Sequence, residues 1–149
     1  MSKIRVQKLN RRFSLWDDKA ITNEDHHRII DLISSDVGRS YILPTALHKL
    51  FLFATNTKRY HSNEIPKNVI TLHAEFILTT ESYKKQLVRI VLPKDIKEQH
   101  DVSVYSPIGV ACLGAREKDQ VIIKYKDFKQ KLLIEKIISQ PTDEGTFYS

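Results

Sequence analysis

Apolar residues recur at helical spacing in two segments of the first half of the chain. Thr22 can cap the first helix, and Glu24 and Asp25 complement the positive end of its dipole. Pro44 suits the first turn of a second helix, where its missing N–H costs no hydrogen bond. The apolar face predicted for this second helix consists of Leu47, Leu50, Phe51 and Ala54. The two segments predict a short antiparallel helical hairpin over residues 21–62, which needs a further partner to bury its apolar surface.

The hydrophobic period changes from helical to alternating after residues 63–66. From Ile70 to Leu78 the even positions are apolar and most odd positions are polar, which predicts a strand with one buried face. Similar patterns predict four more strands, over residues 83–92, 101–105, 120–126 and 131–138. Because the turns between these strands are short, we expect antiparallel pairing.

One short helix interrupts the series of strands. Ser106 is a suitable N-cap, Pro107 fits the first helical position, and Gly114 suits the C-terminal turn. We expect this helix to lie on the sheet. The predicted fold is therefore α+β, a short N-terminal antiparallel helical hairpin followed by an antiparallel β-sheet domain with one short helix.

The chain of 149 residues has a formal net charge of +6, and most of this excess precedes Asp17. That stretch contains no acid and five cations, namely Lys3, Arg5, Lys8, Arg11 and Arg12. A basic arm over residues 1–20 can bind nucleic acid or an acidic protein surface, or it can be a solvated and loosely ordered terminus. The polar residues 142–149 are expected to form a flexible tail.

Composition argues against several kinds of site. Cys112, the single cysteine, cannot form an internal disulfide and is expected to be a small buried residue rather than a nucleophile. No two of the six histidines have the i, i+4 spacing of a metal site on a helix, so no metal and no cofactor are expected. The chain has no apolar run of about 18 residues and no signal-peptide pattern. We therefore expect a cytoplasmic, non-enzymatic protein without a membrane span or catalytic residues.

A compact motif runs from Val102 to Gly114. It consists of an apolar-Ser-apolar strand, the step Ser106-Pro107-Ile108-Gly109, and a Leu-Gly ending. Lys118-Asp119 follows, and Pro93 precedes the motif at the start of a polar loop. In this order the residues resemble the C-terminal domain of the Gre/Rnk family, which comprises the bacterial Gre transcript-cleavage factors and the Rnk regulators of nucleoside diphosphate kinase. The family has a glycine where this chain has Lys118.

The resemblance implies a fold, a partner and a contact site. It implies that residues 63–141 form an FKBP-like domain that docks on the rim of the RNA polymerase secondary channel, with the hairpin as a short coiled coil directed at the channel. The polymerase contacts that it implies are Ser106, Pro107, Ile108 and Gly109. The alternative is that these four residues only start and pack the short helix.

The resemblance also implies what the chain does not do. Gre factors carry paired acidic residues at the hairpin tip, because two carboxylates are needed to hold the catalytic magnesium ion. Here the link over residues 34–43 contains a single acid, Asp36. The chain therefore resembles a Rnk-type regulator of transcription elongation that competes with Gre factors for one docking surface and does not stimulate transcript cleavage.

Two other functions stay open. The basic arm can make the chain a DNA-binding or other nucleic-acid-binding protein, whose affinity would fall steeply with salt. The second is prolyl isomerase activity, which an FKBP-like domain suggests. Such activity requires a ring of aromatic residues on the inner face of the sheet. The aromatic residues of the strand region are scattered, namely Phe76, Tyr83, Tyr105, Tyr125 and Phe128.

Overall fold

The computed structural model describes residues 19–39 and 43–141 of the chain. The five cations of the predicted arm, Lys3, Arg5, Lys8, Arg11 and Arg12, lie outside these ranges, as does the predicted tail over residues 142–149. Within the described ranges, no helix combines the length and hydropathy needed to cross a membrane.

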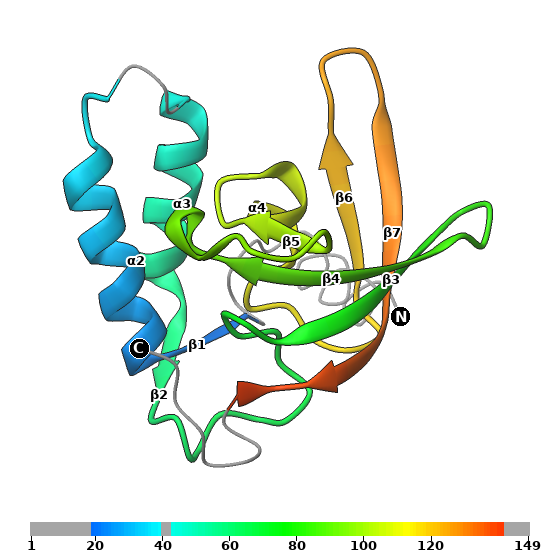
Figure 1. Cartoon of the computed structure of the whole chain (residues 1–149), viewed down its shortest axis with the longest axis horizontal. Helices are drawn as coiled ribbons and strands as arrows, with labels where there is room; N and C mark the ends of the chain where they lie inside the picture. Colours follow the sequence, from blue (N-terminus) through cyan, green and yellow to red (C-terminus); the bar gives the residue numbers. More distant parts are fainter. Residues whose placement is uncertain (1–18, 40–42, 142–149) are drawn as a thin grey trace, which may run out of the picture.

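Two helices lie between two very short strands in the first part of the described chain. The elements are β1 (Ala20–Thr22), α2 (Asn23–Asp36), α3 (Pro44–Asn56) and β2 (Lys58–Tyr60). The helices lie side by side, and β1 and β2 pair in parallel beneath them (Figure 1). Sequence reasoning predicted no strand at either place, because three residues are too few to show an alternating pattern.

Both predicted helix starts are confirmed. The Thr22 hydroxyl accepts a hydrogen bond from the Asp25 N–H at 3.0 Å, and Pro44 occupies the first turn of α3. The apolar face predicted for α3 is wrong at one position, because Phe51 is 45% exposed whereas Phe53 is buried. Phe53 lies at the i+3 position from Leu50, on the face that α3 turns to the core.

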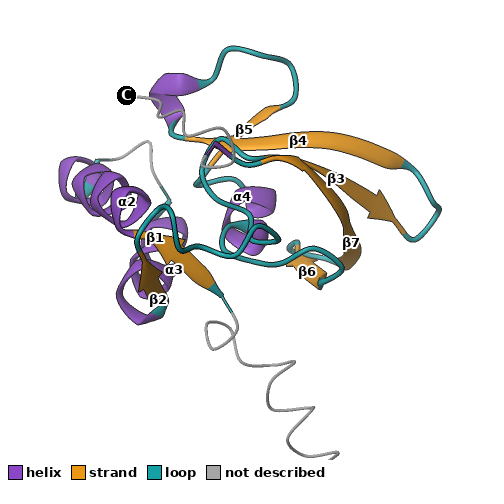
Figure 2. Cartoon of the chain, turned by 90° about the horizontal axis from the view of Figure 1, so that it is seen from below, coloured by secondary structure: helices purple, strands orange, loops and turns teal. Residues whose placement is uncertain are grey.

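The second part of the chain forms a five-stranded sheet with strand order β5-β4-β3-β7-β6. The strands are β3 (Glu75–Thr80), β4 (Lys85–Val91), β5 (Asp101–Ser103), β6 (Gln120–Lys124) and β7 (Lys129–Ser139). The sheet curls around the short helix α4 (Pro107–Cys112), as the arc of strands in Figure 2 shows. The fold is α+β, as predicted, with a curled mixed sheet.

Antiparallel pairing is correct for β3–β4, β3–β7 and β6–β7 but wrong for β5, which runs parallel to β4. The connection over residues 92–100 includes the 3-10 helix η1 (Pro93–Asp95) and returns the chain to Arg89, opposite Asp101. The Asp101 carboxylate accepts hydrogen bonds from the N–H groups of Lys97 and Glu98, each at 2.9 Å. A side chain therefore folds this loop back, and loop length alone does not predict the strand direction.

The strand predicted from Ile70 begins only at Glu75. The preceding residues are largely buried. The His73 N–H donates to the Ile90 carbonyl of β4 at 2.9 Å, but other N–H groups of this segment bond outside the sheet. The Leu72 N–H donates to Asp25 Oδ2 at 3.0 Å, and the Ile70 N–H donates to the Ala115 carbonyl at 2.8 Å. His73 has a φ of 69°, which interrupts the extended conformation.

The helices and the sheet share one hydrophobic core. Its members include Ile29 and Leu50 from the helices and Phe76, Ile90 and Ile134 from the strands. Gly114 lies where α3 meets the sheet domain, with a φ of +81°. A Cβ there would approach the Phe53 ring to 2.6 Å and the Ala20 carbonyl oxygen to 2.9 Å, so this junction requires glycine.

Lys118 adopts the left-handed conformation, with a φ of 76°, at the position where the resembled family has glycine. A side chain costs about 1–2 kcal/mol in this conformation. We expect Lys118→Gly to raise the free energy of unfolding by about 1 kcal/mol, because glycine relieves the strain but loses more entropy on folding. Urea denaturation would measure the change. Lys118→Ala keeps the strain and should give no gain; an equal gain from alanine would contradict the argument.

Candidate functional site

Ser106 organises the start of α4. Its side chain accepts a hydrogen bond from the Gly109 N–H at 3.0 Å and donates one to the Ser103 carbonyl at 2.7 Å. The N-cap predicted from the sequence is therefore confirmed. This half-buried hydroxyl therefore both donates and accepts a hydrogen bond within the loop. Ser106 fixes the conformation of the loop.

The other three predicted contact residues differ in accessibility. Pro107 is exposed at the first helical position, whereas Ile108 is half-buried and packs against the core. Gly109 is buried, and a Cβ at this position would lie 2.3 Å from the Ser103 carbonyl oxygen. Pro107 and the outer part of Ile108 are thus the surface that this loop offers a partner, and Gly109 lets α4 approach β5 closely.

A long-range hydrogen bond connects this loop to the helical pair. The Tyr105 hydroxyl donates to Asp36 Oδ2 at 2.8 Å, and Asp36 is only 8% exposed. Asp36 belongs to the predicted link over residues 34–43, but in the structure it ends α2 and its carboxylate faces the sheet domain. The sequence contains no local signal for this contact, because the two residues are 69 positions apart.

Lys19 lies at the opposite end of α4. Its Nζ donates to the Ala111 carbonyl at 3.1 Å, where the last carbonyls of a short helix lack helical partners. Burial lowers the pKa of Lys19, although Cys112 and Asp119 oppose this effect. Cys112 is fully buried, as predicted, and burial raises the pKa of its thiol to about 12, which disfavours the nucleophilic thiolate form.

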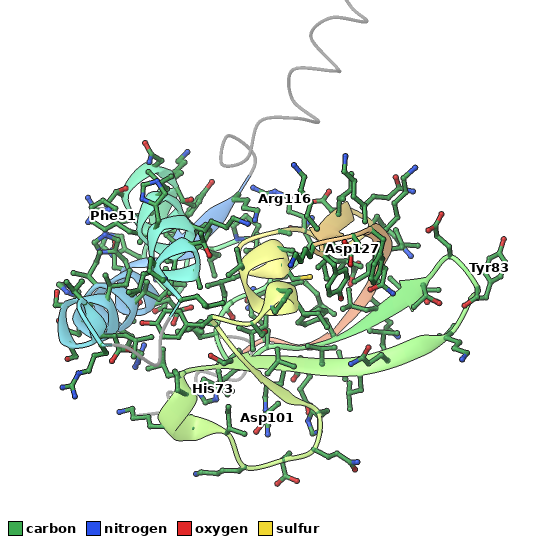
Figure 3. All side chains as sticks on the ribbon, turned by 90° about the horizontal axis from the view of Figure 1, so that it is seen from above. Phe51, His73, Tyr83, Asp101, Arg116 and Asp127 are labelled. Atoms are coloured by element: carbon green, nitrogen blue, oxygen red, sulfur yellow. The ribbon has the colours of Figure 1, made fainter. Side chains whose placement is uncertain are left out.

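A cluster of charged side chains lies on the outer face of the sheet near the η1 loop. Arg89 Nε donates to Asp101 Oδ1 at 2.7 Å, and His100 Nε2 lies 2.9 Å from Glu75 Oε2. Burial alone would raise the pKa of Asp101, but the hydrogen bonds from Arg89 and two backbone N–H groups hold it well below its usual range. Figure 3 shows Asp101 at this edge of the molecule. The charged side chains of this cluster are thus paired with one another, and Asp101 holds the loop over residues 92–100 in place.

The structure brings no set of potential metal ligands together among the residues that it describes. His73, expected on an exposed face, is only 22% exposed and lies 3.7 Å from Asp95. Burial lowers its pKa, and Asp95 opposes this shift. His26 and His27 contact each other edge to face, with centroids 6.1 Å apart.

The aromatic residues considered for an isomerase pocket point to different places. Phe76 is buried on the inner face of the sheet, whereas Tyr83 is 85% exposed at a hairpin tip. Tyr105 bonds to Asp36, and Tyr125 stacks with Phe128 at another tip. These side chains form no common aromatic ring around a pocket.

Comparisons with known proteins place these features in a family. The family model described as transcription elongation factor, GreA/GreB, C-terminal, matches residues 65–139. These residues include the whole five-stranded sheet and α4. No curated protein sequence matches the chain.

Solved structures support the same fold. The prokaryotic transcription elongation factor GreA/GreB from Nitrosomonas europaea aligns with a TM-score of 0.67 at 20% sequence identity, covering 82% of this chain and 98% of that one. Gfh1, the GreA factor homolog 1 of Thermus thermophilus, aligns with a TM-score of 0.43 at 15% identity, over 82% of this chain and 99% of that one. At 20% identity the first alignment establishes the fold, and the second is too weak to add to it.

Proposed function

This chain belongs to the GreA/GreB family of transcription elongation factors, and on that premise we propose that it binds RNA polymerase at the rim of the secondary channel. The docking face would be the start of α4, with Pro107 and Ile108 as the side chains that touch the polymerase. Ser106 and Gly109 would act indirectly, by fixing the loop that presents them.

The exposure of Pro107 within the matched domain is the observation that carries this proposal. Pro107 is the first residue of α4, directly after Ser106, whose side chain caps the helix. Because Pro107 is already held in place, it would lose little conformational entropy when a partner binds. An apolar side chain on a rigid support is a favourable anchor for a protein interface. The half-exposed Ile108 extends the same apolar surface.

We further propose that the chain does not stimulate transcript cleavage. The segment over residues 34–43, which includes the end of α2 and the link to α3, contributes one acid, Asp36, and its carboxylate accepts a hydrogen bond from Tyr105. A single buried carboxylate is a poor site for a hard cation that keeps most of its waters. Helices of 14 and 13 residues reach only about 20 Å at 1.5 Å per residue. Regulation would then come from occupying the docking surface and excluding Gre factors from it.

The proposal is tested by replacing Pro107 with arginine. We expect Pro107→Arg to weaken binding to bacterial core RNA polymerase at least tenfold, because a charge replaces an apolar anchor at the centre of the interface. The free energy of unfolding should change by less than about 1 kcal/mol, since the residue is exposed and only proline's restriction of the unfolded chain is lost. Pull-down at two salt concentrations and urea denaturation would measure the two quantities.

Pro93→Arg is the matched control. Pro93 is also exposed and also occupies the first position of a short helix, η1, so the control adds the same charge at the same kind of site. It should leave polymerase binding unchanged. Equal binding by wild type and Pro107→Arg would remove α4 from the interface, and displacement of a Gre factor by wild type alone would support shared docking.

The alternative function, nucleic-acid binding through the arm cations, rests on residues outside the described ranges. It stays a prediction from charge. Replacing the five cations by glutamine should abolish this binding and leave the effect of Pro107→Arg unchanged, so the two functions can be separated.

A further inference from the structure

The β6–β7 hairpin carries a dense set of cations at its tip. Lys124, Lys126, Lys129 and Lys131 are all exposed, and Asp127 is the single acid among them. Figure 1 shows the hairpin extending away from the sheet beside α4, and α4 contacts β6. The hairpin therefore presents a net positive surface at its tip, on a different element from the loop at Pro107.

The register of the hairpin places like charges opposite each other. Lys124 pairs directly with Lys129 across the two strands, and Lys131 pairs with the exposed Ile122. Like charges directly opposite on neighbouring strands destabilise a hairpin. Neither lysine of the Lys124–Lys129 pair has a carboxylate directly opposite, so an anionic partner would relieve the repulsion.

Two aromatic rings lie among these lysines. Tyr125 and Phe128 stack with centroids 4.5 Å apart and an interplanar angle of 22°. The turn is closed by the Tyr125 N–H, which donates to the Phe128 carbonyl at 2.7 Å, and by the Tyr125 hydroxyl, which lies 3.2 Å from Gln130 Oε1. Phe128 nevertheless remains 60% exposed and Tyr125 38% exposed. The pair therefore keeps ring surface available to a ligand.

We propose that the β6–β7 hairpin tip binds single-stranded nucleic acid, with Phe128 and Tyr125 stacking on unpaired bases and the lysines contacting the phosphates. Proteins bind single strands through exposed aromatic rings and neighbouring cations, because every base has an aromatic face and every nucleotide carries a negative charge. Duplex nucleic acid would use the cations but not the rings. This site is additional to the proposed polymerase docking, and it lies in the folded domain rather than in the basic arm.

The first test measures binding of labelled single-stranded RNA and DNA of mixed sequence by fluorescence anisotropy, using the full chain. Phe128→Ala should weaken binding about tenfold through loss of one stacked base. Tyr83→Ala is the matched control, because Tyr83 is 85% exposed at the tip of the β3–β4 hairpin, away from Asp127 (Figure 3). It should leave the affinity unchanged. Phe128→Trp should retain it, because tryptophan restores a stacking ring, and thermal denaturation would show that each variant is folded.

The second test measures the salt dependence. The double change Lys126→Gln and Lys129→Gln should reduce the slope of log affinity against log salt by about 1.4, at roughly 0.7 for each lost phosphate contact with a single strand. Lys94→Gln with Lys97→Gln removes the same charge from the exposed η1 loop and should leave the slope unchanged. Repeating both tests with the five arm cations replaced by glutamine isolates the hairpin.

The outcomes are distinct. Ring-dependent and lysine-dependent binding in the arm-neutral chain supports the site, and preference for RNA or DNA identifies the ligand. Binding that depends on the lysines but not on Phe128 overturns the proposal in favour of a purely electrostatic surface, such as one for an acidic protein. Unchanged affinity in all hairpin variants overturns it outright, whatever the result for Pro107→Arg.

Discussion

Gly109→Ala is expected to lower the free energy of unfolding by about 3 kcal/mol, the upper end of the usual cost of overpacking. The added Cβ would lie 2.3 Å from the Ser103 carbonyl oxygen and 3.0 Å from the Val104 Cα. Both atoms belong to the backbone, so no side-chain rotation can relieve the contact. The start of α4 would have to move away from β5, which would also disturb the Ser106 cap.

Urea denaturation measures this loss, and Gly38→Ala provides the control. Gly38 has a φ of +82°, but a Cβ added to it would have no atom within 4 Å, so its replacement tests backbone strain without crowding. We expect about 1 kcal/mol there. If Gly109→Ala costs no more than Gly38→Ala, the close approach of α4 to β5 is not a constraint. A loss of polymerase binding by Gly109→Ala would reflect this structural damage, unlike a loss by Pro107→Arg.

Asp101→Ala is expected to lower the free energy of unfolding by about 3–5 kcal/mol at neutral pH, the usual cost of breaking a buried ion pair. The Asp101 side chain is fully buried and accepts hydrogen bonds from Arg89 and from the N–H groups of Lys97 and Glu98. Its removal leaves these three donors without their acceptor. The return loop that makes β5 parallel to β4 would lose its main internal constraint.

The contribution of Asp101 should also depend on pH. The pKa of Asp101 is lower in the folded protein than in the unfolded chain, where it is near 3.9. Its stabilising effect is therefore fully present when the pH is above the pKa of the unfolded chain. The effect is lost as the pH falls from there through the pKa of the folded protein. Urea denaturation between pH 7 and pH 3 should show a smaller acid-dependent loss in Asp101→Ala than in wild type. Hydrogen bonds from Thr79 and Lys85 also lower the pKa of Glu135, but this carboxylate is more exposed, so Glu135→Ala should reduce the acid-dependent loss by less than Asp101→Ala does.

Local patterns predicted the elements better than their pairing. Caps at Thr22 and Ser106 and the alternation in β4 and β6 are encoded by neighbouring residues, and each appears in the structure. The pairing of Ala20 with Lys58 and the parallel direction of β5 depend on residues far apart in the sequence. No periodicity reports such contacts, so they could not be predicted from one sequence.

The helix start at residues 106–109 was predictable from the sequence, but the exposure of its residues was not. The sequence identified the step at residues 106–109 through its capping pattern and its family resemblance. It could not show that Gly109 is buried against Ser103 while Pro107 is exposed. The lysines and rings of the β6–β7 hairpin tip are neighbours in the sequence, but the stacking of Tyr125 on Phe128 depends on how the turn closes, which no periodicity reports.

Three long-range hydrogen bonds join the helical pair to the sheet domain, one at the Gly114 junction and one near each end of α2. The Ala20 N–H donates to the Gly114 carbonyl at 3.1 Å, Asp25 binds the Leu72 N–H, and Tyr105 binds Asp36 at the far end of α2. Bonds at both ends of one helix leave it no free pivot against the sheet. A partner that binds α4 would therefore also fix the position of the loop end of the α2–α3 pair relative to itself. The distance from α4 to that end could be increased only by adding helical turns.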